Sequence, residues 1–454
     1  MRVLVIGLAV TGEAVVRHRV PAGDDVTAIE DRPGAAPGWE ERRAAAAGLG
    51  AEVVVAPTSE HAAALAAAAD LVVPSPGVPA GHAALAAARR HGVAVRSEID
   101  LAAEAADAAG SPAIVAVTGT NGKTTVTTLT AAMLDAAGIP TVAAGNIGRP
   151  LLDAVYDDVA VVVAEVSSFQ LAFTERFAPR GATILNLGAD HLDWHRTFDA
   201  YTAAKANVFS KQRPDDLLVF NADDPVVAGL AASAPGRTQP FSVAAGAARG
   251  ARVLETATGR LLVAANGEEI IAVDDLPSSR PADLANALAA SALALDLGAE
   301  VAAVGDALRA FESLPHRMQL VAAHDGIRWI DDSKATNVHA AVAAVRGLDR
   351  VVLVAGGRNK GIDLGELRVL APHLRGVVAI GDAAHEIEDA FHGLVPVVRA
   401  TSMRAAVRSA SELARPGDTV LLSPGCASFD WYASYAARGD DFADEVRALV
   451  EVER

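Results

Sequence analysis

One short segment restricts the fold of this chain more than any other. The apolar run AIVAV at residues 113–117 leads into the loop TGTNGKTT at 118–125, and a helical pattern follows directly. When a buried strand turns through glycines into a helix, backbone N–H groups can converge on phosphate oxygens at the positive helix end. The segment therefore predicts a parallel α/β sheet with a phosphate-binding loop.

The loop also predicts which phosphate ligand is bound. Its spacing departs from the pattern G-x-x-x-x-G-K-[ST], because only Thr120 and Asn121 lie between its two glycines. Lys123 would neutralise charge on the β- and γ-phosphates, and the Thr124 hydroxyl could ligate magnesium. We therefore expect ATP to bind the loop formed by Gly119, Thr120, Asn121, Gly122, Lys123, Thr124 and Thr125.

The length of 454 residues and the pattern of apolar runs predict three domains. In the first hundred residues, short apolar runs alternate with alanine-rich helical stretches, which is typical of a parallel sheet with crossover helices. We expect a Rossmann-like domain at 1–108, a central P-loop-type ATPase domain with a mostly parallel sheet at 109–312, and a Rossmann-like domain at 313–454. Residues 237–273 read as an antiparallel appendage of the central domain.

Composition excludes several classes of function. A formal net charge of -17 disfavours nucleic acid as a partner, since binding to a phosphate backbone relies on a basic surface. No apolar run is long enough to predict a membrane span, and the N-terminus reads as a buried strand rather than a signal peptide. The single cysteine, Cys426, excludes an internal disulfide and fits a reducing compartment. We expect a monomeric cytoplasmic protein.

Further candidate residues follow two later strands. Glu165 ends the run VAVVVAE, where a carboxylate at the carboxyl end of a parallel strand can meet magnesium. His191 follows the run ATILNL and is a candidate metal ligand or phosphate contact. Lys205 lies on a predicted helix and by itself indicates only a solvated surface.

Taken together, the motifs resemble those of the ATP-dependent Mur ligases, in the family's order and over the whole chain. The segments that carry the resemblance are GTNGKTT (119–125), GNIG (145–148), EVSSFQL (165–171), ADHLDWH (189–195), YTAAK (201–205), NALAA (286–290), LPHR (314–317), DDSKATN (331–337), GGRNKG (356–361) and SPGCAS (423–428).

The resemblance implies an ATP-dependent acid–amino-acid ligase of peptidoglycan synthesis. The segment DDSKATN looks like that of the members that add D-glutamate to UDP-N-acetylmuramoyl-L-alanine, whereas GTNGKTT and the strand-end glutamate are shared with folylpolyglutamate synthetases. The implied reaction passes through an acyl phosphate. The implied cofactors are ATP and Mg²⁺ at two sites, and the substrates are small molecules. Cell wall biogenesis, cell shape and cell division would depend on such an enzyme.

The resemblance also implies roles for individual residues. Lys123, Glu165, His191 and Lys205 would be catalytic, and Thr124, Glu165, His191 and a carbamylated Lys205 would hold magnesium. Asn286, Arg317 and Asp332 would contact adenine, γ-phosphate and ribose. The implied substrate-binding residues are Thr11, Asp31, Arg32 and Gly77 for the UDP part, Asn146 and Ser167 at the nucleotide–substrate junction, and Lys334, Thr336, Lys360, Ser428 and Tyr435 for the amino-acid carboxylates.

Two segments depart from known patterns. Ala9 stands where a dinucleotide-binding loop would have its second glycine, which weakens the case for an NAD-dependent dehydrogenase. Ala282 and Asp283 precede Asn286 where the family often has a His-Asn pair, so the adenine contacts upstream are open. A different Mur ligase, a folylpolyglutamate synthetase and a nucleotide-gated binding protein without turnover would each share part of these motifs.

Overall fold

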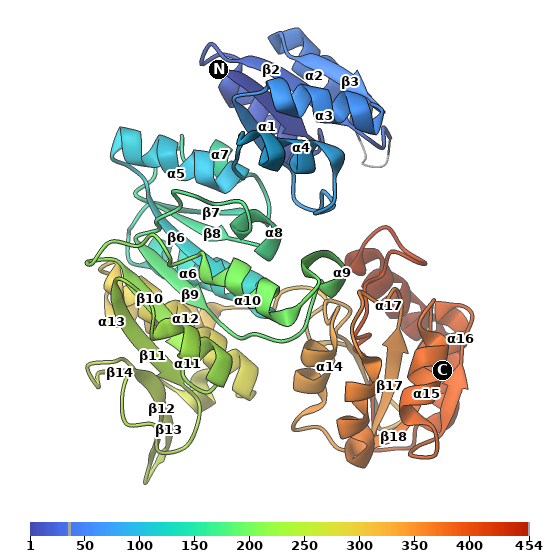
Figure 1. Ribbon diagram of the computed structural model, residues 1–454. Helices are drawn as coiled ribbons and strands as arrows, with labels where there is room; N and C mark the ends of the chain where they lie inside the picture. Colours follow the sequence, from blue (N-terminus) through green and yellow to red (C-terminus); the bar gives the residue numbers. More distant parts are fainter. Residues whose placement is uncertain (35–37, 453–454) are drawn as a thin grey trace. The chain divides into compact units, whose positions relative to one another are not determined.

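The computed structural model describes residues 1–34 and 38–452. Within them the strands form three sheets, distributed over two compact units. The first unit joins Met1–Leu187 to Asp199–Phe311, and the second joins Gly188–Phe198 to the chain from Glu312 onward. The predicted α/β architecture is confirmed, with mostly parallel sheets (Figure 1).

The first sheet is fully parallel and has the strand order β3-β2-β1-β4-β5. Its strands are β1 (Arg2–Ile6), β2 (Asp25–Glu30), β3 (Glu52–Val55), β4 (Leu71–Pro74) and β5 (Ala94–Val95). The helices of this region are α1 (Val10–Arg19), α2 (Trp39–Leu49), α3 (Ser59–Ala68), α4 (Ala83–His91) and α5 (Glu98–Ala109). Alanines on α3 and α4 pack on Leu4 and Ile6, so the alanine-rich stretches supply one face of the core.

The second sheet has the order β14-β13-β12-β11-β10-β9-β6-β8-β7. Its strands are β6 (Ala113–Thr118), β7 (Thr141–Gly145), β8 (Val161–Glu165), β9 (Gly181–Ile184), β10 (Leu217–Asn221), β11 (Arg237–Ser242), β12 (Ala251–Thr256), β13 (Gly259–Val263) and β14 (Glu269–Ala272). The helices are α6 (Lys123–Ala136), α7 (Leu151–Ala154), α8 (Ser168–Leu171), α10 (Phe198–Ala206), α11 (Pro225–Ala231), α12 (Pro281–Asp296) and α13 (Val301–Ala310), with a short 3-10 helix at Val273–Asp275.

The expectation of an antiparallel appendage over residues 237–273 is wrong in part. Strand β11 pairs parallel with β10, and β12 pairs parallel with β11 over a short register. The reason is that α11 carries the chain back across the sheet between β10 and β11, as in a crossover connection. Only β12, β13 and β14 form an antiparallel meander.

Helices cover the apolar strands of the second sheet. Helices α6 and α12 pack on one another, and their buried side chains share a cluster with Val115, Val163 and Val219 (Figure 1). Strands buried in this way read as continuous apolar runs, which explains why β6 and β8 were predictable from sequence. The packing fixes the strand ends at which the phosphate loop begins.

The third sheet has the order β15-β16-β20-β17-β18-β19, and only the β15–β16 pairing is antiparallel. Its strands are β15 (Gln319–His324), β16 (Ile327–Asp331), β17 (Val351–Gly356), β18 (Leu374–Ile380), β19 (Val397–Arg399) and β20 (Thr419–Leu422). The helices of this unit are α9 (Leu192–His195), α14 (Val338–Val345), α15 (Ala384–Phe391), α16 (Met403–Leu413) and α17 (Tyr435–Val452), with a 3-10 helix at Leu364–His373.

Within the first unit, polar contacts join the domain of the first sheet to the second sheet. The Ser97 amide donates to the Phe173 carbonyl at 2.7 Å, and the Leu152 amide donates to Oε1 of the buried Glu98 at 2.6 Å.

None of the helices in the described part of the chain is both long and apolar enough to cross a membrane.

Candidate active site

The phosphate loop connects β6 to α6 and depends on its two glycines. Gly119 and Gly122 have φ of +150° and +86°, which L side chains rarely adopt. A Cβ at Gly122 would lie 2.4 Å from Oδ1 of Asn286, so no larger residue fits there. The same contact brings Asn286, the predicted adenine-binding residue, against the loop.

The Lys123 ammonium contacts the backbone of the loop. Its Nζ donates to the carbonyls of Gly119 and Thr120, each at 2.9 Å. Lys123 is also the first residue of α6, so its charge adds to the positive end of the helix. Thr124 and Thr125 follow in the first helical turn and are half-buried. This arrangement suits the binding of a polyphosphate anion.

Sequence reasoning missed the residue that holds the loop in place. Asn186, just beyond β9, accepts from the Asn121 amide at 2.9 Å through Oδ1 and donates to the Asn121 carbonyl at 3.1 Å through Nδ2. Its own carbonyl accepts from the Thr120 amide at 2.9 Å. The signal was available in the sequence, because a polar residue that ends an apolar strand beside the loop strand is placed at the same sheet edge.

Glu165 ends β8 directly beside the start of the loop, since Val117 and Glu165 are register partners. The carboxylate is buried, at 3% exposed, and its Oε1 accepts from Asn146 Nδ2 at 2.9 Å. Among the described residues its Oε2 has no hydrogen-bond partner. A buried carboxylate oxygen without a donor is the kind of ligand that Mg²⁺ requires, so the residues present fit a bound magnesium ion.

Lys205 is fully buried beneath the loop, although it lies on a helix that reads as surface. Only 2% of the residue is exposed. Its Nζ donates to the Gly119 carbonyl at 2.7 Å and to Thr118 Oγ1 at 3.3 Å. The Tyr201 ring, from the same YTAAK motif, lies 5.0 Å from Nζ. The motif therefore packs against the phosphate loop.

Ser167 begins α8 as its N-cap. Its Oγ accepts from the Gln170 amide at 3.3 Å, while the Gln170 side chain accepts from the Ser167 amide, which completes a capping box. The box fixes the backbone two residues beyond Glu165, so Ser167 lies close in sequence to the candidate metal ligand.

The candidate residues for the UDP part gather at one edge of the first sheet. Thr11 follows β1, Asp31 and Arg32 follow β2, and the exposed Gly77 follows β4, which are neighbouring parallel strands. The Glu30 carboxylate, which sequence reasoning missed, accepts from the Leu8 amide at 2.9 Å and from the Arg32 amide at 3.0 Å. These loops therefore have a defined shape at the edge where ligands bind to such sheets.

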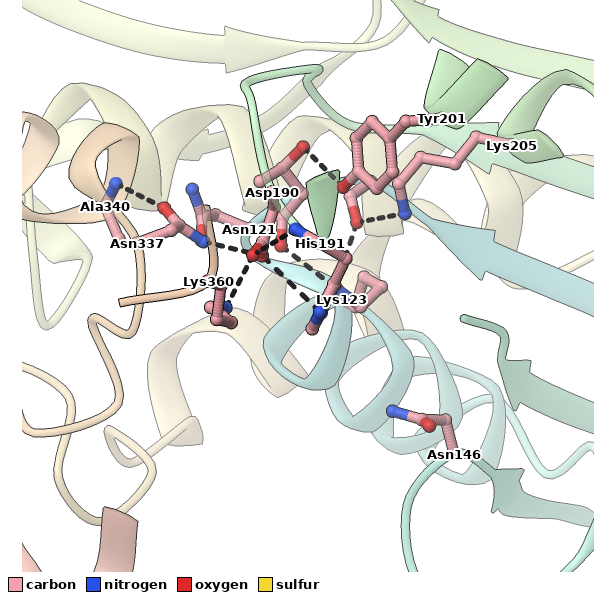
Figure 2. Close-up of polar contacts among 12 residues, drawn as sticks. Asn121, Lys123, Asn146, Asp190, His191, Tyr201, Lys205, Asn337, Ala340 and Lys360 are labelled. Atoms are coloured by element: carbon pink, nitrogen blue, oxygen red, sulfur yellow. Dashed lines mark hydrogen bonds and ion pairs between the residues drawn. The ribbon is translucent and has the colours of Figure 1, made fainter. Parts of the chain in front are cut away.

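In the second unit, the Asp190 carboxylate contacts several polar residues from different loops (Figure 2). Its carboxylate forms an ion pair with Lys360 Nζ at 2.5 Å and accepts from Asn337 Nδ2 at 3.2 Å. The His191 amide donates to the same carboxylate at 2.9 Å, and His191 has a φ of +53°. Asp190 was not among the predicted residues, although it stands in the ADHLDWH motif next to His191.

The remaining candidates of this unit lie in several segments. Asp332, Lys334 and Thr336 follow β16, Lys360 follows β17, Ser428 follows β20, Arg317 precedes β15, and Tyr435 begins α17. Asp332 accepts from the Met318 amide at 3.2 Å and from Ser423 Oγ at 3.0 Å, so protein donors already contact both of its oxygens. The Lys334 ammonium lies 3.8 Å from the centroid of the Tyr435 ring. Arg317, Thr336 and Lys360 are half-buried, and Ser428 is buried.

Comparisons with known proteins agree over the whole chain. Family models match residues 1–97 (Mur ligase MurD-like, N-terminal domain), 117–294 (Mur ligase middle domain) and 316–426 (Mur ligase, glutamate ligase domain). Two curated relatives are named UDP-N-acetylmuramoylalanine--D-glutamate ligase. The protein from Frankia casuarinae is 44% identical, over 98% of this chain and 94% of that protein. The protein from Methylococcus capsulatus is 41% identical, over 99% of this chain and 95% of that protein.

A solved structure supports the fold independently. The MurF ligase of Thermotoga maritima, determined in complex with ADP, matches with a TM-score of 0.63 at 16% identity, over 95% of this chain and 96% of that one. The matched domains and the relatives above 40% identity lead to one assignment. The chain belongs to the Mur ligase family.

Proposed function

We propose that this enzyme uses ATP to join D-glutamate to UDP-N-acetylmuramoyl-L-alanine in peptidoglycan synthesis. The observation that carries the proposal is the 44% identity, over 98% of the chain, to a protein named for that ligation. The phosphate loop around Lys123 and the lysines of the second unit supply the chemistry that the reaction needs. One group binds a polyphosphate, and the other suits an amino acid with two carboxylates.

The chemistry requires activation of a carboxylate. A carboxylate and an amine do not condense in water, because hydroxide is a poor leaving group. Transfer of the γ-phosphoryl group of ATP to the carboxylate of the muramoyl-alanine substrate gives an acyl phosphate and releases ADP. The amine of D-glutamate attacks its carbonyl carbon, and the tetrahedral intermediate releases phosphate to leave the amide. Lys123 would balance charge on the transferring group, and positioning would supply much of the remainder.

Magnesium would occupy two sites in this proposal. When bound, Mg²⁺ would offset negative charge on the phosphates. Glu165 and Thr124 would hold the first ion, and His191 with a carbamylated Lys205 would hold the second. The buried, unpaired Oε2 of Glu165 supports the first site. An ammonium cannot ligate magnesium, whereas a carbamate on Lys205 would present carboxylate-like oxygens.

The three-domain division gives each substrate a place. Residues 1–108 would bind the UDP part through Thr11, Asp31, Arg32 and Gly77, residues 109–312 would bind ATP, and residues 313–454 would bind the amino acid. Asn146 and Ser167 would line the junction. Asn286, Arg317 and Asp332 would contact ATP, and Lys334, Thr336, Lys360, Ser428 and Tyr435 would serve D-glutamate. We propose a monomeric enzyme in the cytoplasm, where ATP and the UDP-linked precursor are present.

An omission experiment tests the proposed reaction. Phosphate release from ATP is measured with UDP-N-acetylmuramoyl-L-alanine and D-glutamate together, and with either one left out. Turnover that requires both substrates and Mg²⁺ is the expected result. Steady ATP hydrolysis without D-glutamate, or no turnover with all substrates present, would contradict the proposal.

A further inference from the structure

The two lysines proposed for the amino-acid carboxylates differ in how their charge is used. Lys360 forms an ion pair with Asp190 at 2.5 Å. Lys334 has no carboxylate partner among the residues that the structure describes, and its backbone amide donates to the His316 carbonyl at 3.2 Å. The ammonium of Lys334 therefore keeps its full charge, whereas that of Lys360 is largely balanced.

An aromatic face holds the Lys334 ammonium. Its Nζ lies 3.8 Å from the centroid of the Tyr435 ring, well within the distance for a cation–π interaction. No hydrogen bond of the Tyr435 hydroxyl occurs within residues 1–34 and 38–452, so the ring is the part of this side chain that makes the specific contact. The His316 ring meets Tyr435 edge-on, with centroids 6.1 Å apart, and helps to fix its plane.

The backbone segments that carry the two residues are tied together. Ser333, next to Lys334, donates through Oγ to the Tyr435 carbonyl at 2.7 Å. The buried Arg438 donates from Nε to Ser333 Oγ at 3.0 Å and from Nη2 to the Ser333 carbonyl at 2.9 Å. Because both backbones are anchored, the ring and the ammonium meet in a defined geometry instead of one among many lysine rotamers.

We propose that Tyr435 is a positioning residue for D-glutamate, and that it acts through its ring by holding the Lys334 ammonium ready for a substrate carboxylate. An acidic partner would position the lysine equally well but would cancel the charge that the substrate needs. An aromatic ring restrains the cation and leaves that charge in place. This inference rests on the proposed function, since it assigns the carboxylate to the amino-acid substrate.

Paired substitutions at Tyr435 test the inference. Tyr435→Phe keeps the ring and removes the hydroxyl, so the KM for D-glutamate should stay within about twofold of wild type. Tyr435→Leu removes the ring, so this KM should rise by about fivefold to thirtyfold, the range of a cation–π contact, with the KM for ATP unchanged. Tyr156→Leu, at an exposed tyrosine of the first unit, serves as a matched control and should change neither constant.

A double substitution shows whether Tyr435→Leu acts through Lys334 or by a general disturbance of the structure. In a Lys334→Gln background, Tyr435→Leu should add less than about a twofold increase in KM, because its partner is already gone. A full further increase in that background, or an equal loss in Tyr435→Phe, would overturn the inference. If Tyr435→Leu does not fold, Tyr435→Phe alone decides, and a KM raised about tenfold or more would overturn it. Wild-type protein that cannot use D-glutamate would refute the proposed function instead.

Discussion

At the scale of single residues, the proposed function gives Lys123 a role in phosphoryl transfer. Its Nζ donates to two loop carbonyls at 2.9 Å, and its side chain is half-buried, so truncation removes charge but little packing. Lys123→Ala should lower kcat by about a hundredfold or more while the thermal unfolding midpoint changes little. Phosphate release and circular dichroism measure the two effects. A folded variant with near-normal kcat would refute the assignment of the loop.

Substitutions at Lys205 test the proposed second magnesium site. If its amine carries carbon dioxide as a carbamate, Lys205→Ala should lose about a hundredfold or more in kcat and regain part of it with acetate, which can enter the vacated space. Lys205→Arg should stay inactive with acetate, because the positive charge remains and no cavity opens. Mass analysis showing an unmodified amine at full activity without bicarbonate would exclude the carbamate.

Glu98 gives the stability of the first unit a pH dependence. Burial, the largest cause, raises the pKa of this carboxyl to about 7, although the Leu152 amide opposes the shift and Asp153 adds to it. The folded state therefore favours the protonated form. The stability that results is present below the ordinary pKa of 4.5 and is lost as pH rises toward about 7.

Urea unfolding of wild type and Glu98→Gln measures this effect. Between pH 5 and pH 7, wild type should lose about 1.4 kcal/mol per pH unit relative to the variant, because glutamine does not titrate. The ion pairs of Asp153 with Arg17 and His18 are common to both proteins and cancel in the comparison. A stability difference that is constant over this range would show that Glu98 has an ordinary pKa.

At the scale of elements, the phosphate loop depends on the strand beside it. Asn186 at the end of β9 fixes both sides of Asn121 by two hydrogen bonds. Asn186→Ala should raise the KM for ATP by about tenfold, since each lost bond contributes about 1 kcal/mol, with a smaller change in the KM for D-glutamate. Initial-rate kinetics with each substrate varied in turn provide the measurement. Equal changes in both constants would indicate general loss of structure.

Apolar runs in the sequence mark the fully buried strands of the second and third sheets most clearly. The runs AIVAV and VAVVVAE correspond to β6 and β8, and β17 and β20 are likewise mostly apolar. Strand β7, with half-buried Thr141 and Val142, and the antiparallel β15, with exposed Gln319 and Leu320, lack that pattern and were not predicted. Their pairing is decided by neighbours distant in sequence, which local periodicity does not encode.

In the candidate site, too, features formed by contiguous residues could be predicted from the sequence, and contacts between distant segments could not. The loop at 118–125 was recognisable because strand, glycines and helix are contiguous. The burial of Lys205 and the contact of Lys334 with Tyr435 both depend on packing between segments far apart in the chain. For this reason the sequence around Lys205 by itself indicates only a solvated surface. Resemblance to the family's motifs singles out both lysines, and the structure gives their contacts, with the Gly119 carbonyl for Lys205 and with the Tyr435 ring for Lys334.

At the scale of the whole molecule, one chain presents three sets of candidate binding residues. The edge of the first sheet carries loops shaped by Glu30, and the second carries the phosphate loop. Loops of the second unit carry Lys334 and the ion pair of Asp190 with Lys360. Each set lies at the carboxyl ends of parallel strands, where helix termini and loops present donors to anions. The reaction proposed here needs a nucleotide-linked acid, ATP and an acidic amino acid, which are all anionic.

The most direct test of the central claim is the choice of amino acid. With ATP, Mg²⁺ and UDP-N-acetylmuramoyl-L-alanine, kcat/KM is measured for D-Glu, L-Glu, L-Lys, meso-diaminopimelate and D-Ala-D-Ala, beside a folate substrate with L-Glu, and each product is identified by mass. We predict an amide product with D-Glu at a kcat/KM at least about a hundredfold above the others. Preferred incorporation of L-Lys, diaminopimelate or D-Ala-D-Ala, or glutamylation of folate, would contradict the account.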